Sequence, residues 1–253
     1  MSPNHNTITS VPGIRVGHAV EPGGKSGCTV LLGPFRGAVE VCGTITGARE
    51  LGVLSSHHVS PTIEALVLSG GSSFGLSVAD GVVGWLASQG LGFRVGDTRV
   101  PLVPAGVIYD LQSKVPRPDA AMGRAACEAA SDAPVPEGLE GAGAGASAGK
   151  IRGIGKGMPT GLGSWAMPLG QWTVGALAVT NPFGDVLDAW GGVLAGARDD
   201  GGVFVNTARE LREAAVAGAL DTSTLPGINN TLAVVATDAP LSRVALGRVA
   251  RVA

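Results

Sequence analysis

Glycine restricts the folding of this chain more than any other residue type. It occupies 41 of 253 positions, while aromatic residues make up only 4% of the chain. Because glycine has no Cβ atom, it lets backbone segments approach one another closely. Hydrophobic residues account for 45% and charged residues for 15%, which predicts a well-covered core of small side chains such as Ala and Val. The densest glycine run, residues 141–150, is expected to be a loop packed tightly against neighbouring backbone.

The hydrophobic pattern mixes helices and strands without a regular alternation. Apolar residues at helical spacing predict helices at residues 74–88, 120–131, 208–220 and 243–253. Apolar or alternating runs between turn residues predict strands at residues 14–18, 28–32, 38–46, 65–69, 171–180 and 186–189. This mixture favours a layered α+β sandwich over a doubly wound parallel sheet. No linker or internal repeat is evident, so residues 1–253 are expected to form a single domain.

Charge and cysteine content argue against several function classes. The net charge is −2 without a basic run, so neither nucleic acid nor a membrane surface is an expected partner. Cys28, Cys42 and Cys127 are widely spaced and odd in number, which is typical of reduced thiols in the cytoplasm. No apolar run approaches the roughly 20 residues that cross a bilayer, and the N-terminus lacks a signal pattern. We expect a cytoplasmic protein that uses no cofactor or metal, with some apolar surface covered by other subunits.

A turn followed by a strand near the end of the sequence carries the first chemical hypothesis. Residues 226–230 read Pro-Gly-Ile-Asn-Asn, a turn signal, and residues 231–237 form an apolar, β-branched run. If the bond between Asn230 and Thr231 were cut, Thr231 would carry both a hydroxyl and a free α-amine. An α-amine with a pKa of roughly 7.7–8.0 can take the hydroxyl proton without any histidine. The alternative is a turn that simply leads into a strand.

A second nucleophile candidate lies in residues 71–75, which match the G-x-S-x-G pattern around Ser73. The base histidine of that arrangement follows the serine in sequence, whereas His5, His18, His57 and His58 all precede Ser73. A strand-to-helix turn, with N–H groups that cap the helix or bind an anion, is therefore the favoured interpretation.

Several segments together resemble the DmpA-like family, which contains L-aminopeptidase/D-amino-acid esterases, β-aminopeptidases and nylon-oligomer hydrolases. The segments that carry this resemblance are residues 13–18, 69–76, 103–111, 141–150 and 229–238. They occur in the same order over almost the whole chain. The sequence is most similar to the nylon-oligomer hydrolases, because Thr231 follows Asn230 where other members have Ser after Gly.

The resemblance implies a precursor that cuts itself between Asn230 and Thr231 into a large subunit, 1–230, and a small subunit that begins at 231. Thr231 would be the nucleophile that forms an acyl-enzyme with a small amide or peptide substrate. Lys150 would tune the charge around it, Asn181 would donate to the oxyanion, and the Tyr109 hydroxyl would orient substrate. The implied fold is a four-layer α/β/β/α sandwich resembling N-terminal nucleophile hydrolases with different connectivity. The implied assembly is a homotetramer of processed heterodimers.

The chain departs from the family pattern after Thr231. Residues 231–253 are much shorter than the family's small subunit, and they lack the acidic motif that helps position the nucleophile. We therefore expect the small subunit to be truncated. The sequence predicts an N-terminal-threonine amidohydrolase, with 6-aminohexanoate oligomers or related peptides as candidate substrates. The alternatives are an L-aminopeptidase/D-amino-acid esterase of the same family and a non-processing scaffold or binding protein on the same fold.

Overall fold

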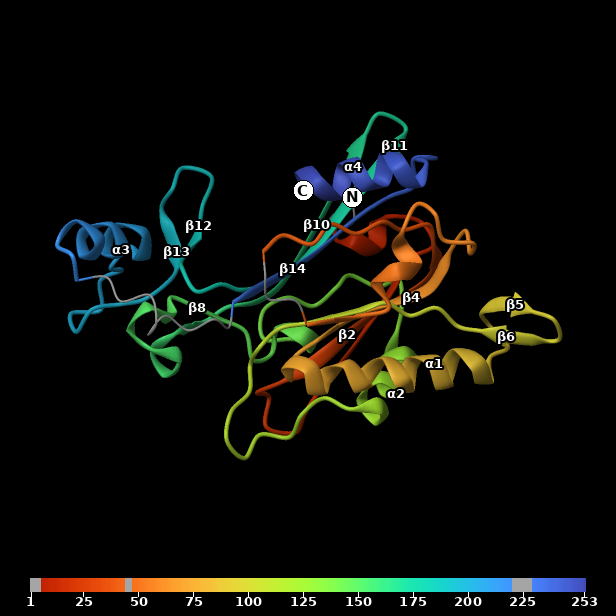
Figure 1. Ribbon diagram of the computed structural model, residues 1–253, viewed down its shortest axis with the longest axis horizontal. Coiled ribbons are helices and arrows are strands. Elements are labelled where there is room, and N and C mark those ends of the chain that lie inside the picture. Colours follow the sequence, from red (N-terminus) through yellow and green to blue (C-terminus); the bar gives the residue numbers. More distant parts are fainter. Residues whose placement is uncertain (1–5, 44–46, 220–228) are drawn as a thin grey trace.

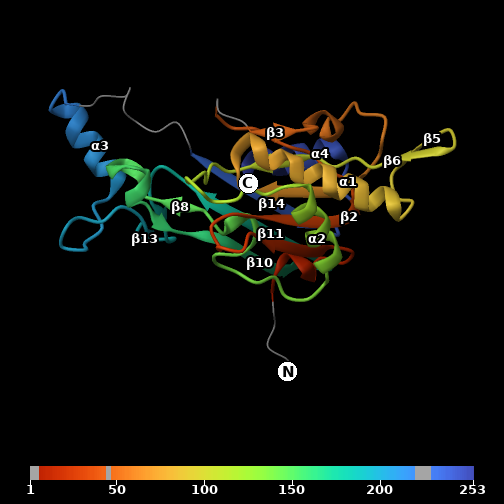
Figure 2. The same ribbon diagram turned by 90° about the horizontal axis from the view of Figure 1, so that it is seen from below.

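The computed structural model describes residues 6–43, 47–219 and 229–253. Two β-sheets are packed face to face, and two helices cover the outer face of the larger sheet (Figure 1). A smaller lobe projects from one end of this body, as the view from below also shows (Figure 2). The mixed, layered α/β architecture predicted from the hydrophobic pattern is confirmed.

The larger sheet has five strands in the order β1-β2-β4-β7-β3. All neighbouring pairs are antiparallel except β4 and β7, which run parallel. The strands are β1 (Arg15–Val20), β2 (Gly27–Phe35), β3 (Ala48–Arg49), β4 (Ile63–Ser69) and β7 (Ala105–Val107). β2 and β4 are mostly apolar and mostly buried, as expected for strands covered on both faces.

Helices α1 (Val78–Ser88) and α2 (Ala120–Ala129) form the layer over this sheet. Two glycines let them approach: a Cβ at Gly81 would lie 1.8 Å from the Ala120 carbonyl oxygen, and one at Gly123 would lie 2.1 Å from that of Val78. The core between these helices and the sheet consists largely of Val, Ala and Cys side chains. The small-residue core predicted from composition is confirmed here.

The second sheet contains β10 (Gly161–Leu169), β11 (Trp172–Asn181) and β14 (Asn230–Thr237), all antiparallel, with β11 in the centre. A second apolar core fills the space between the two sheets. Leu232 and Val234 of β14 pack against it. β14 is paired with β11 over its whole length, from Asn181 opposite Asn230 to Val174 opposite Thr237. The described residues thus show a helix layer and two sheet layers.

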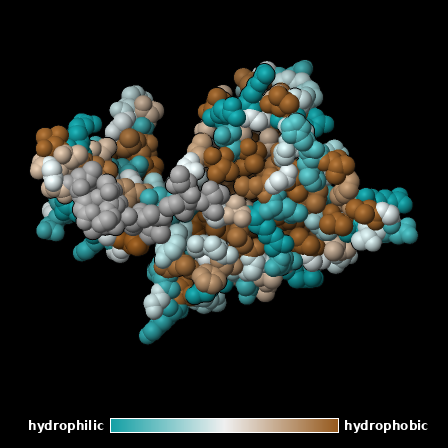
Figure 3. All heavy atoms as spheres, in the orientation of Figure 1, coloured by the Kyte–Doolittle hydropathy of each residue, from teal (hydrophilic) through white to brown (hydrophobic). Residues whose placement is uncertain are grey.

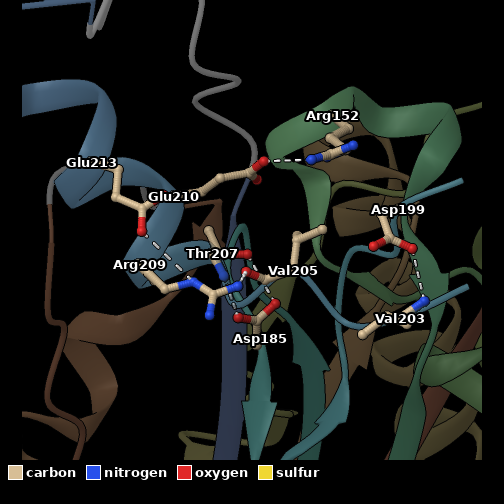
Figure 4. A network of polar contacts seen from close by, with 9 residues as sticks. All are labelled: Arg152, Asp185, Asp199, Val203, Val205, Thr207, Arg209, Glu210 and Glu213. Carbon is tan, nitrogen blue, oxygen red and sulfur yellow. Dashed lines mark hydrogen bonds and ion pairs between the residues drawn. The ribbon is translucent and has the colours of Figure 1, made fainter. Parts of the chain in front are cut away.

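The lobe holds the hairpin β12 (Val186–Leu187) and β13 (Val193–Ala195), the short pair β8 (Ser147–Ala148) and β9 (Met158–Pro159), and α3 (Thr207–Val216). A polar network fixes α3 to the rest of the lobe: Asp185 accepts hydrogen bonds from both the backbone N–H and the hydroxyl of Thr207 (Figure 4). Arg152 forms an ion pair with Glu210 of α3 in the same network. A hollow of about 450 Å³ lies between the second sheet and the hairpin, and hydrophobic residues are prominent on this side of the molecule (Figure 3).

Most predicted elements are present with shifted ends, but one predicted strand is absent, and β10 and several short strands were not predicted. The expected strand at 38–46 is wrong, because residues 38–43 form no strand and residues 44–46 lie outside the described part. β10 was not predicted; Gly161, Gly163 and Pro168 weaken its strand pattern, and pairing with β11 forms it nonetheless. The helix at 243–253 corresponds to α4 (Arg243–Val252). The turn expected at Pro226 and Gly227 also lies outside the described residues.

Candidate active site

Lys150 is placed by the glycine that precedes it. Gly149 has a φ of +71°, a conformation that favours glycine, and a Cβ there would lie 1.9 Å from the backbone nitrogen of Ala197. The backbone N–H groups of Gly149 and Lys150 donate to the carbonyls of Gly184 and Phe183, at 2.7 and 2.8 Å. The end of the glycine run is therefore fixed against the segment that follows β11, and the tight packing predicted for this run is confirmed.

The Lys150 ammonium is surrounded by neutral oxygen atoms. Its Nζ donates to the carbonyls of Ser147, Asn181 and Pro182 at 2.9, 3.0 and 3.1 Å, and to Asn181 Oδ1 at 2.7 Å. The residue is 1% exposed, so this lysine is buried and not solvated. Burial without a carboxylate partner lowers the pKa of Lys150 from 10.5 to about 8. A lysine with such a pKa can release or accept a proton near neutral pH.

Asn181, at the end of β11, is fully buried and uses both ends of its amide. Its Oδ1 accepts from the Ser147 backbone N–H at 3.1 Å as well as from Lys150. Its Nδ2 donates to the carbonyl oxygen of Tyr109 at 3.0 Å. The side chain is therefore held in one orientation, with an N–H group committed to Tyr109.

Tyr109 joins this network through its backbone. Its carbonyl accepts from Asn181, and its N–H donates to Asn230 Oδ1 at 3.2 Å. Asn181 and Asn230 lie opposite each other on β11 and β14, so the Tyr109 peptide bridges the ends of two paired strands. The hydroxyl role predicted for Tyr109 stays a prediction, because the contacts in this network are made by main-chain atoms.

Thr231 lies beside the network in sequence but on the other face of the sheet. Along β14 from Asn230 to Val235 the side chains alternate between half-buried and exposed, and Thr231 is exposed. Its cross-strand partner is Thr180. Because successive side chains of a strand point to opposite faces, the Thr231 side chain points away from the face that carries Asn230 and Asn181. The structure thus brings Lys150, Asn181, Tyr109 and Asn230 together, and places the Thr231 hydroxyl across the sheet from them.

The competing serine candidate has a different role. Ser73 is exposed in the 3₁₀-helix Ser72–Ser77 after β4. The N–H of Gly71 in this turn donates to Asp110 Oδ1 at 2.6 Å, so the anion that the turn holds is a carboxylate of the chain itself. Sequence reasoning did not single out Asp110; the only signal was its position next to Tyr109 in residues 103–111.

The part of the chain that the structure describes contains no group of three or more His, Cys, Asp or Glu residues suited to hold a metal ion. In the same part, none of the helices has the length and apolar character required to traverse a bilayer.

Comparison with known proteins shows which proteins this chain resembles in fold and in sequence. The fold is similar to that of the solved L-aminopeptidase/D-Ala-esterase/amidase of Ochrobactrum anthropi, which is described as a variant of the Ntn hydrolase fold. The two structures superimpose with a TM-score of 0.57 at 23% sequence identity. The aligned region covers 99% of this chain and 68% of that one. An uncharacterized aminopeptidase of Mycobacterium leprae is 37% identical over 98% of this chain and 72% of its own length. A 6-aminohexanoate-oligomer endohydrolase of a Kocuria strain is 36% identical over 95% of this chain and 66% of its own length.

These relationships define the class of protein as an amide-bond hydrolase with a variant of the Ntn hydrolase fold. The sequence model of peptidase family S58 matches residues 6–253, so the chain belongs to peptidase family S58. The family resemblance found in the sequence segments is confirmed. The chain spans roughly two thirds to three quarters of the length of the relatives described above.

Proposed function

We propose that this chain is a self-processing amidohydrolase whose nucleophile is Thr231 after a cut between Asn230 and Thr231. The observation that supports this most is the buried network of Lys150, Asn181 and Tyr109, which ends on the side chain of Asn230. That network fixes the residue on one side of the proposed scissile bond. Pairing of β14 with β11 fixes the residue on the other side.

The cut follows from the local chemistry of the Asn230–Thr231 bond. The Thr231 hydroxyl attacks the Asn230 carbonyl carbon, the amide C–N bond breaks, and the departing nitrogen takes a proton to become the α-amine of Thr231. Water then hydrolyses the resulting ester, which leaves a carboxylate on Asn230 and restores the hydroxyl. With its pKa near 8, Lys150 is about one tenth neutral at pH 7. It can accept the hydroxyl proton, and return it to the departing nitrogen, once Thr231 turns toward the face of the sheet that carries the network.

The processed enzyme would use the same groups on an external amide. The new α-amine takes the Thr231 hydroxyl proton as the oxygen attacks the substrate carbonyl. The amine of the substrate leaves with a proton, and water releases the acyl group from Thr231. The amide N–H of Asn181 that is not donated to Tyr109 is the proposed donor to the oxyanion, and the Lys150 ammonium is a second one if it exchanges one of its present acceptors. Removing a measured donor of this kind typically costs about 2.7–4 kcal/mol. Because Thr231 faces the other side of the sheet in the uncut chain, its freed N-terminal residue must turn for these donors to act.

For the substrate, we propose a small amide, with 6-aminohexanoate oligomers or short peptides as the classes named for the relatives. An L-aminopeptidase/D-amino-acid esterase activity is the second candidate; the Ochrobactrum protein is named an L-aminopeptidase/D-Ala-esterase/amidase. A fourth, helical layer over the second sheet would complete the α/β/β/α sandwich. The exposed Trp165, Met167 and Leu169 of β10 would give that layer an apolar surface. The homotetramer of processed heterodimers and the cytoplasmic location stay predictions.

Intact-mass analysis of protein made from the complete gene tests the proposal. We expect two fragments divided after Asn230 in the wild type and one uncut chain in Thr231→Ala. Thr237→Ala, in the same strand, is the matched control and should be cut like the wild type. A wild type that remains a single chain would refute self-processing and favour a non-processing scaffold. Release of amines from a 6-aminohexanoate dimer and from an L-aminoacyl anilide then separates the two substrate classes.

A further inference from the structure

Asp110 is a buried carboxylate that no step above uses. It is 6% exposed, its Oδ1 accepts from the Gly71 N–H at 2.6 Å, and its Oδ2 accepts from the Ser26 hydroxyl at 2.8 Å. Both donors are neutral, and burial raises the pKa of this carboxyl above its usual range. Burying such a group without a cation is costly, so its placement calls for an explanation.

Two more glycines, one of them on a further segment, lie against the same carboxylate. A Cβ at Gly70 would lie 2.2 Å from Asp110 Oδ2, and one at Gly145 would lie 2.4 Å from it. Gly70 and Gly71 belong to the turn after β4, Ser26 to the loop between β1 and β2, and Gly145 to the glycine run that leads to Lys150. Asp110 is therefore the point at which three separate loops meet.

The end of β4 and the turn after it also hold Ile108, two residues before Asp110. Ile108 N–H donates to the Ser69 carbonyl, and Ser72 N–H donates to the Ile108 carbonyl, both at 2.9 Å. Residues 108–110 are thus held at both ends, by main-chain hydrogen bonds at Ile108 and by side-chain hydrogen bonds at Asp110. Tyr109, between the clamped residues, presents its N–H to Asn230 and its carbonyl to Asn181.

We propose that Asp110 is a positioning residue for the reaction at Asn230–Thr231: its hydrogen bonds to Gly71 and Ser26 fix the Tyr109 peptide, which in turn fixes Asn181 and Asn230. This inference rests on the function proposed above. It also gives residues 69–76, the segment with the serine pattern, a part in the site, because their backbone holds residues 108–110. Asp110 itself contacts neither the scissile bond nor its nucleophile and acts through Tyr109.

The test compares Asp110→Ala with Asp110→Asn in the full-length protein. Asparagine can still accept from Gly71 N–H and can donate to the Ser26 oxygen, so it preserves the geometry without the charge. We expect the rate of self-cleavage to fall about tenfold or more in Asp110→Ala and by less than about threefold in Asp110→Asn. In the processed fraction of each variant, kcat should fall in the same order while KM changes little.

Asp185→Ala is the matched control, because Asp185 also accepts from one backbone N–H and one hydroxyl, both of Thr207 (Figure 4). It should lose a comparable amount of thermal stability and still be cut at the wild-type rate. Should Asp110→Ala fail to fold, Ser26→Ala removes a single donor and should slow cleavage with the fold intact.

Wild-type cleavage rates in Asp110→Ala, or equal slowing in both Asp110 variants, would overturn the positioning role. So would a slowing in Asp110→Ala no greater than that in Asp185→Ala, or cleavage of a folded Ser26→Ala at the wild-type rate. An uncut wild type would overturn the proposed function together with this inference. The comparison of wild type with Thr231→Ala therefore tests the function, and the comparison of wild type with the Asp110 variants tests the inference.

Discussion

The buried ammonium of Lys150 predicts how stability changes at alkaline pH. Its pKa is about 8 in the folded chain against 10.5 for an ordinary lysine. Between these two values the unfolded chain keeps a proton that the folded chain has released, so the free energy of unfolding rises with pH. At about 1.36 kcal/mol per pKa unit, the complete gain is roughly 3 kcal/mol.

Two buried thiols oppose this gain at higher pH. Burial raises the pKa of Cys28 and Cys127 from 9.0 to about 12, so above pH 9 the unfolded chain releases protons that the folded chain retains. Each thiol then lowers the free energy of unfolding by about 1.36 kcal/mol per pH unit, and the two together exceed the contribution of Lys150. We therefore expect stability to rise from about pH 8 to about pH 9 and to decline above that.

Urea unfolding of the uncut Thr231→Ala chain, with and without Lys150→Met, isolates the lysine. Methionine does not titrate, and the thiols contribute equally to both proteins, so the difference between the two unfolding curves reports Lys150 alone. The difference should grow by about 1.4 kcal/mol per pH unit from pH 8 upward and level off near pH 10.5. Differences that stay constant over this range would refute the claim that Lys150 is desolvated.

Two further predictions concern other buried positions. Gly149→Ala should destabilise the chain by about 2–4 kcal/mol in a denaturant titration, because φ is +71° and the new Cβ would meet the Ala197 nitrogen. The control is Gly84→Ala in α1, where a Cβ meets nothing within 4 Å. It should be neutral or slightly stabilising in the same titration. Burial lowers the pKa of His18 from 6.5 to about 4, so the folded chain resists its protonation and stability should fall as pH drops from 6.5 towards 4. This loss should be smaller in His18→Gln, and an unchanged acid profile would contradict the prediction.

The spacing of apolar residues along the chain predicted the parts of the fold that depend on local sequence. The helical spacing of residues 78–88 and the apolar runs of β4 and β14 are recovered in the structure. β10 was not predicted because its glycines and its proline favour other conformations. It forms a strand through its pairing with β11. Residues 38–43 show the opposite case: their composition is strand-like, but they pair with no strand in the part of the chain that the structure describes.

The sequence singled out Lys150, Asn181 and Tyr109, which the structure joins in one network, but it did not reveal the geometry of that network. Lys150, Asn181 and Tyr109 came from the family resemblance, since composition alone favours a solvated lysine, a turn amide and a packed ring. The contacts that join them span 31 to 121 positions in sequence, and the contacts of Tyr109 within the network are made by main-chain atoms, which residue type does not reveal. Asp110 is hidden for the same reason, because its partners Ser26 and Gly71 are 84 and 39 positions away.

The pairing of β14 with β11 along its whole length affects how a processed form would be purified and detected. A break before Thr231 would leave the strand hydrogen-bonded to β11, with Leu232 and Val234 still in the core between the sheets. The two polypeptides would then dissociate only when the sheet itself unfolds. A single affinity tag on either piece should therefore retrieve both under native conditions, and a denaturing gel would be needed to reveal that the backbone had been cut.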